Sequence, residues 1–126
     1  MKENILKSIL VIDDEENIRD LLNRFLKKLN YKVDTASDLT EAVYSINKQL
    51  PDIIFLDIVL PGCNGIEILK LLKLFRKDII VIMISGYADE NLAKESLKKG
   101  AFDYLTKPFD ISHIEDMLKL IDAKFV

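Results

Sequence analysis

The sequence is poor in the features that mark secreted, membrane-bound and disulfide-stabilised proteins. Its 126 residues include one cysteine, three prolines and no tryptophan. The single cysteine, Cys63, excludes an intrachain disulfide, and the start of the chain is too polar for a signal peptide. The longest apolar run, residues 79–84, has six residues, whereas a membrane helix needs about 20. We therefore expect a cytoplasmic protein with no membrane segment.

An excess of basic charge is also missing. Lys and Arg together number 18 against 21 for Asp and Glu, so the net charge is −3. Because nucleic-acid binding needs a basic surface, we expect no direct contact with nucleic acid. Hydrophobic residues make up 49% of the chain and charged residues 31%, which is typical of a soluble globular protein. We expect residues 1–126 to form one domain.

Five short β-type runs alternate with five segments of helical spacing. The runs cover residues 8–13, 31–36, 52–57, 79–85 and 102–106. The first, third and fourth are almost continuously apolar, which is typical of parallel strands that are covered on both faces. The second run alternates between polar and apolar residues, which favours an edge position. Such alternation of strands and helices predicts a doubly wound α/β domain with right-handed crossovers.

Local signals indicate where several of the helices begin and end. Asp38, three residues before Glu41, and Asn64, three residues before Glu67, are predicted to cap the second and third helices. Gly100 is predicted to end the fourth helix. The first helix carries one apolar stripe with helical spacing, formed by Ile18, Leu21, Leu22, Phe25, Leu26 and Leu29.

Acidic, hydroxyl and ammonium groups follow the predicted strands. In open α/β sheets the functional groups gather beyond the carboxyl ends of the strands. Here those ends carry Asp13-Asp14, Asp57, Ser85 and Lys107. Crowded carboxylates repel one another unless a cation joins them, and Mg²⁺ is the usual intracellular candidate. A metal, a nucleophilic Asp and a lysine together suit phosphoryl transfer, and a serine hydroxyl can donate to a phosphoryl oxygen.

Each of these residues taken singly has a plainer explanation, and other residues fit no site. Asp14 alone is more often a helix cap, and Lys107 alone is more often a surface lysine. His113, the only histidine, is expected to be solvated, and Cys63 is expected to be incidental in a turn. The first strand–helix turn lacks glycine and reads DDEE over residues 13–16, which excludes a dinucleotide site that needs free backbone N–H groups.

Four segments, in this order and spacing, resemble the receiver domains of bacterial two-component response regulators. They are residues 9–15 (ILVIDDE), 57–65 (DIVLPGCNG), 84–87 (ISGY) and 100–109 (GAFDYLTKPF). The resemblance extends over essentially the whole chain. It implies a flavodoxin-like fold, with a five-stranded parallel sheet in the order 2-1-3-4-5 and five helices.

The resemblance also implies a phosphorylation site that depends on Mg²⁺. Asp57 corresponds to the residue that accepts a phosphoryl group from a phosphohistidine on a sensor histidine kinase or a histidine phosphotransfer protein. Asp13, Asp14, Asp57 and the backbone carbonyl of Val59 correspond to the family's metal ligands. Such a protein is a phosphoacceptor switch that assists its own phosphorylation and dephosphorylation, without the turnover of an ordinary enzyme.

Four further residues correspond to the switching machinery of that family. Lys107 corresponds to the lysine that contacts the phosphoryl group, and Pro108 to a proline that usually follows a cis peptide bond. Ser85, where many relatives have threonine, and Tyr104 correspond to the switch pair. They would change the face formed by the fourth helix, fifth strand and fifth helix, which would then meet an output domain, a partner protein or a second copy of the chain.

Two alternatives from other classes stay open at this point. A phosphatase of the haloacid-dehalogenase type also uses an Asp nucleophile, but it usually has a second Asp two residues later, where this chain has Val59. A pseudo-receiver or flavodoxin-like binding module would need neither phosphate nor Mg²⁺, and the full set of acids and lysine argues against it.

Overall fold

A five-stranded parallel sheet forms the centre of the protein. The computed structural model describes residues 7–86 and 89–125, so Tyr87, in the third of the four matching segments, lies outside the described residues. The sheet has the order β2-β1-β3-β6-β7, and every neighbouring pair is parallel. In order along the chain this is 2-1-3-4-5, so the predicted fold and the edge position of the second strand are confirmed. Its strands are β1 (Ser8–Ile12), β2 (Lys32–Ala36), β3 (Ile53–Asp57), β6 (Ile80–Ser85) and β7 (Asp103–Thr106).

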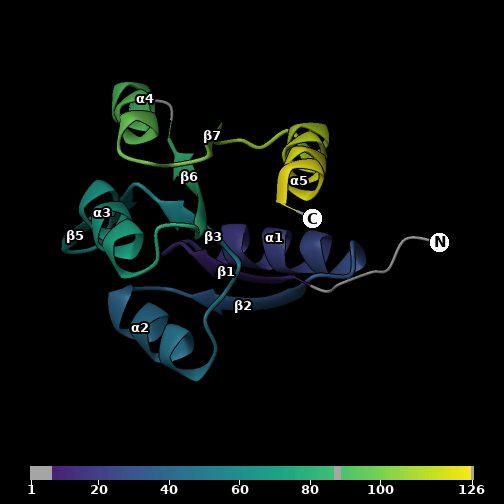
Figure 1. Ribbon diagram of the computed structural model, residues 1–126, viewed down its shortest axis with the longest axis horizontal. Helices are drawn as coiled ribbons and strands as arrows, with labels where there is room; N and C mark the ends of the chain where they lie inside the picture. Colours follow the sequence, from purple (N-terminus) through teal and green to yellow (C-terminus); the bar gives the residue numbers. More distant parts are fainter. Residues whose placement is uncertain (1–6, 87–88, 126) are drawn as a thin grey trace.

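Helices cover both faces of this sheet. In Figure 1, α2, α3 and α4 lie on the left side of the sheet, and α1 and α5 lie on the right. Among the described residues these are the five helices: α1 (Glu16–Lys28), α2 (Leu39–Lys48), α3 (Gly65–Phe75), α4 (Glu90–Lys98) and α5 (Ile111–Phe125). None of them combines the length and the apolar character that crossing a membrane requires.

The central strand β3 shows how the sequence pattern fills the two cores. All five of its residues are buried, and successive side chains point to opposite faces. Ile53 and Phe55 pack in the core beneath α1 and α5, whereas Ile54 and Leu56 pack in the core beneath α2, α3 and α4. A continuous apolar run is therefore the pattern that this strand needs.

The three predicted helix ends agree with the structure, whereas the alternative explanation of Asp14 as a helix cap does not. The Asp38 side chain accepts a hydrogen bond of 2.8 Å from the backbone of Glu41, and the Asn64 side chain accepts one of 2.8 Å from Ile66. Gly100 follows α4 with a φ of +109°, a conformation that favours glycine. Helix α1 is capped by Glu15 without a side-chain hydrogen bond, so the cap explanation for Asp14 is wrong.

The segment after β3 contains a small hairpin where the sequence indicates only a loop. Strands β4 (Val59–Leu60) and β5 (Cys63–Asn64) pair antiparallel around Pro61 and Gly62. Gly62 has a φ of +71°, and a proline followed by such a glycine suits a tight turn. Two-residue strands are too short to show a period in the sequence, which is why this pairing is not predictable from it.

Candidate functional site

Three carboxylates from two neighbouring strand ends meet at one edge of the sheet. Asp13 and Asp14 follow β1, and Asp57 ends β3, which pairs with β1. One oxygen from each of the three side chains lies within 4.8 Å of the others. Asp13 and Asp57 are buried, whereas Asp14 is exposed. The predicted convergence of these strand ends is therefore present in the fold.

Two hydrogen bonds hold Asp13 in place, yet within the described residues one of its carboxylate oxygens receives none. Its Oδ1 accepts a hydrogen bond of 2.9 Å from the backbone N–H of Glu15, and its backbone carbonyl accepts one of 2.9 Å from the Arg19 guanidinium. Within the described residues, the buried Oδ2 receives no hydrogen bond. Lys107 Nζ lies 3.2 Å from it, as an ion pair outside hydrogen-bonding geometry. Burial raises the pKa of this carboxyl group.

Asp57 lies beside Asp13 and is only 5% exposed. Its Oδ1 accepts a hydrogen bond of 3.0 Å from the backbone N–H of Val59, and its Oδ2 lies 3.5 Å from Lys107 Nζ. Burial raises the pKa of Asp57 to about 6, and the negative charge of Asp13 acts in the same direction. The Val59 N–H and the Lys107 ammonium oppose this rise without cancelling it.

Lys107 follows the edge strand β7 and brings a positive charge to the same cluster of carboxylates. Its Nζ lies 3.2 Å from Asp13 and 3.5 Å from Asp57, and it also donates a hydrogen bond to the Glu15 carboxylate. Burial alone would lower the pKa of Lys107, but its contacts with these three acids raise it above the ordinary value. The peptide bond between Lys107 and Pro108 is cis.

The three aspartates fit a divalent cation. Their oxygens are the ligand type that Mg²⁺ prefers, and they lie close enough to share one ion. Within the described residues, the buried Oδ2 of Asp13 receives no hydrogen bond and is only ion-paired with Lys107 at 3.2 Å, so a divalent cation would further compensate its desolvation. Burial raises the pKa values of Asp13 and Asp57, and a bound cation would favour their charged forms. The role of the Val59 carbonyl as a ligand stays a prediction.

The match to a known family agrees with this arrangement. Residues 9–119 match the response regulator receiver domain. The chain belongs to the response regulator receiver domain family.

Several relatives of this receiver domain are similar along most of the chain. Sporulation initiation phosphotransferase F of Bacillus subtilis (strain 168) is 38% identical over 113 residues, which cover 90% of this chain and 91% of that protein. The alkaline phosphatase synthesis transcriptional regulatory protein PhoP of the same organism is 39% identical over 115 residues, 91% of this chain but 48% of PhoP. The chain thus spans about half the length of PhoP.

Solved structures show the same fold. The crystal structure of the receiver domain of NtrX from Brucella abortus has a TM-score of 0.81 and 33% sequence identity, and the match covers 91% of this chain and 95% of that one. A response regulator receiver domain protein from Clostridium thermocellum has a TM-score of 0.85 and 31% identity, over 94% of this chain and 97% of that one. A longer NtrX chain is matched over 26% of its length.

The proposed switch residues of the receiver domain lie on neighbouring strands. Ser85 ends β6 and is buried, and its Oγ donates a long hydrogen bond of 3.4 Å to the carbonyl of Leu105. Tyr104 on β7 is half-buried and packs against the core beneath α2, α3 and α4. The backbone of Lys107 donates to the Ser85 carbonyl at 2.9 Å, which ties the lysine to the serine strand.

Three contacts in this receiver domain are not foreseen from the sequence. Glu15 reaches Lys107 across 92 residues of chain, and Arg19 donates to the Asp13 carbonyl. Gly65 packs so closely that a Cβ there would lie 2.5 Å from the carbonyl oxygen of Asp57. The sequence signals for these contacts are weak. Glu15 and Arg19 are marked only by their closeness to Asp13 along the chain, and Gly65 only by following an Asn.

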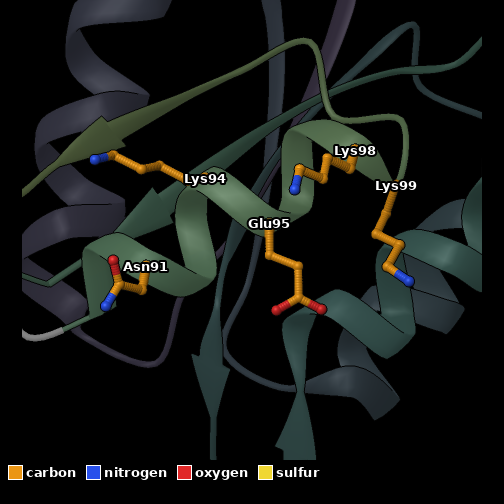
Figure 2. Close-up of a pocket in the computed structure, with 5 residues that line it drawn as sticks. All are labelled: Asn91, Lys94, Glu95, Lys98 and Lys99. Atoms are coloured by element: carbon orange, nitrogen blue, oxygen red, sulfur yellow. The ribbon is translucent and has the colours of Figure 1, made fainter.

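A shallow hollow on α4 lies apart from the acidic edge. It is lined by residues of α4 and its C-terminal cap, and Figure 2 shows their side chains spreading in different directions: Asn91, Lys94, Glu95, Lys98 and Lys99. None of the three clustered aspartates lines this hollow. His113 is exposed on α5, as expected. The chemical site is therefore the strand-end cluster and not this surface hollow.

Proposed function

We propose that this receiver domain, residues 1–126, accepts a phosphoryl group on Asp57 from a phosphohistidine donor in a Mg²⁺-dependent step. One observation carries the proposal. Two buried aspartates, a third exposed one and a lysine ammonium converge where strands β1, β3 and β7 end. That combination supplies a nucleophile, metal ligands and a cation for phosphoryl oxygens in one place.

The transfer joins the Asp57 carboxylate oxygen to phosphorus. The phosphorus–nitrogen bond of the phosphohistidine breaks, and its electron pair leaves with the imidazole nitrogen. Bound Mg²⁺ would neutralise charge on the carboxylates and the phosphoryl oxygens. The Val59 N–H holds Oδ1 of Asp57 at 3.0 Å and so fixes the orientation of the carboxylate. Lys107, 3.5 Å from Asp57 Oδ2, supplies positive charge for a phosphoryl oxygen.

The same contacts support a switch through Ser85 and Tyr104. A phosphoryl group adds negative charge and acceptor oxygens that the buried site must satisfy. The Ser85 hydroxyl makes only a 3.4 Å bond to Leu105, so it can turn toward those oxygens at little cost. Movement of Ser85 and the inward turn of Tyr104 would reshape the face formed by α4, β7 and α5.

We infer the partners from this role. A sensor histidine kinase or a histidine phosphotransfer protein in the cytoplasm donates the phosphoryl group. The face formed by α4, β7 and α5 transmits the change to an output domain or partner protein, or pairs two phosphorylated copies. Some relatives are about as long as this chain and others are about twice as long: one matches it over 91% of its own length and another over only 48%.

Labelling with acetyl phosphate tests the proposal. The wild-type protein should acquire an acid-labile phosphoryl group when Mg²⁺ is present and lose this ability in excess chelator. Asp57→Asn should abolish the label, whereas Asp34→Asn, at an exposed aspartate on β2, should keep it. Labelling that survives Asp57→Asn would refute the assignment. Sustained hydrolysis of a generic phosphoester would instead favour a phosphatase.

A further inference from the structure

Glu15 makes a contact that the proposed phosphorylation chemistry does not require. It is the last residue before α1, and its side chain is 57% exposed, whereas Asp13 and Asp57 are buried. Its Oε1 accepts a hydrogen bond from Lys107 Nζ. Lys107 Nζ also lies 3.2 Å from Asp13 and 3.5 Å from Asp57.

Glu15 is not one of the carboxylates grouped for a metal ion. Among the described residues, the cluster whose oxygens lie within 4.8 Å of one another contains Asp13, Asp14 and Asp57. Glu15 instead faces the lysine, and its backbone N–H fixes Oδ1 of Asp13 at 2.9 Å. Its side chain therefore pairs with Lys107 and stands outside this set of candidate metal ligands, although its charge also raises the pKa of the neighbouring Asp13.

The lysine cannot serve every acceptor equally well. An ammonium has three donor hydrogens, and Lys107 already faces three carboxylates. A phosphoryl group on Asp57 would bring further oxygens that need donors. Each hydrogen that Lys107 gives to Glu15 is then withheld from the phosphoryl group, in the transition state as well as in the product.

We propose that Glu15 is a positioning residue that competes with the incoming phosphoryl group for the Lys107 ammonium and so slows the loading of Asp57. The proposal rests on the proposed role of Asp57. Interactions that are stronger in the ground state than in the transition state lower the rate, and the ion pair between Glu15 and Lys107 is of that kind. In the unphosphorylated receiver domain, the Lys107 ammonium is thus held by Glu15.

Two substitutions at neighbouring residues separate the effect of the contact between Glu15 and Lys107 from the effect of removing one negative charge near the site. Glu15→Gln removes the charge that faces Lys107, and Glu16→Gln removes an equal charge from the next, exposed residue. Both variants reduce the repulsion of an anionic donor. With acetyl phosphate and Mg²⁺, Glu15→Gln should be phosphorylated about 2- to 5-fold faster than Glu16→Gln, the size expected for a partly exposed ion pair. Equal rates, or a slower Glu15→Gln, would overturn the proposal.

A second measurement tests the contact without phosphate or metal. In magnesium-free protein, the nitrogen NMR resonance of the Lys107 ammonium should move in Glu15→Gln and stay in place in Glu16→Gln. An unmoved resonance in Glu15→Gln would contradict the contact itself. Circular dichroism on both variants checks that they are folded. If wild-type Asp57 is never labelled, the proposed function is wrong. If it is labelled and the two variants are phosphorylated at equal rates, only the proposed competition by Glu15 is wrong.

Discussion

Replacing Asp57 by Asn should stabilise the metal-free protein at neutral pH, although it destroys the proposed phosphorylation site. In the native state the Asp57 carboxylate is 5% exposed and lies close to the buried Asp13. Ionising it there costs free energy, because burial and a neighbouring negative charge both oppose the charged form. Asparagine has nearly the same shape without that charge, and its oxygen can still accept the hydrogen bond from Val59.

The size of the gain follows from the pKa of Asp57. Burial raises this pKa from 3.8 to about 6, so the native state binds more protons than the unfolded state between those pH values. Stability therefore falls as the pH rises through this window, by about 3 kcal/mol at most for this group. The raised pKa already includes the opposing ion pair with Lys107, and because asparagine is a weaker hydrogen-bond acceptor than the carboxylate, we expect about 1 to 3 kcal/mol of net stabilisation at pH 7. Below pH 4 the two proteins should be nearly equally stable.

Urea unfolding in excess chelator measures this difference. The chain has no tryptophan, so circular dichroism of the helices is the appropriate signal. Asp34→Asn makes the same chemical change at an exposed position on β2 and should shift the midpoint little. Added Mg²⁺ should stabilise the wild-type protein more than Asp57→Asn, because the variant lacks one of the proposed ligands. A metal-free Asp57→Asn that is less stable than wild type at pH 7 would refute the electrostatic reasoning.

Three other substitutions test the packing around the site and the capping of a helix. Gly65→Ala should cost about 2 to 4 kcal/mol of stability and impair phosphorylation, because its Cβ would lie 2.5 Å from the Asp57 carbonyl oxygen. Gly62→Ala, with open space around the Cβ but a φ of +71°, should cost only about 1 kcal/mol, so equal losses in urea titrations would contradict this packing argument. Asp38→Ala removes the cap that binds the Glu41 N–H and should lower the unfolding free energy by about 1 kcal/mol with no change in acetyl phosphate labelling. A labelling defect in that variant would show that α2 affects the site.

Much of the fold can be read from local patterns along the chain. The apolar runs predict buried parallel strands because a strand covered on both faces has no polar side, as in β3. Asp38, Asn64 and Gly100 mark helix ends because caps and left-handed turns are satisfied within a few residues. The hairpin of Val59–Leu60 with Cys63–Asn64 escapes this approach because its strands are too short to carry a pattern.

For the site, too, some features can be predicted from the sequence and others cannot. Strand ends in a parallel sheet share one edge, so the order of strands and acids along the chain was enough to predict that Asp13, Asp14 and Asp57 converge. The strength of their interactions was not predictable in this way. The Asp13 oxygen that receives no hydrogen bond within the described residues, the raised pKa of Asp57 and the hydrogen bond from Lys107 to Glu15 depend on burial and on distances between segments far apart in sequence. Those quantities exist only once the chain is packed, because solvent exclusion and contact geometry belong to the folded molecule and not to any residue type.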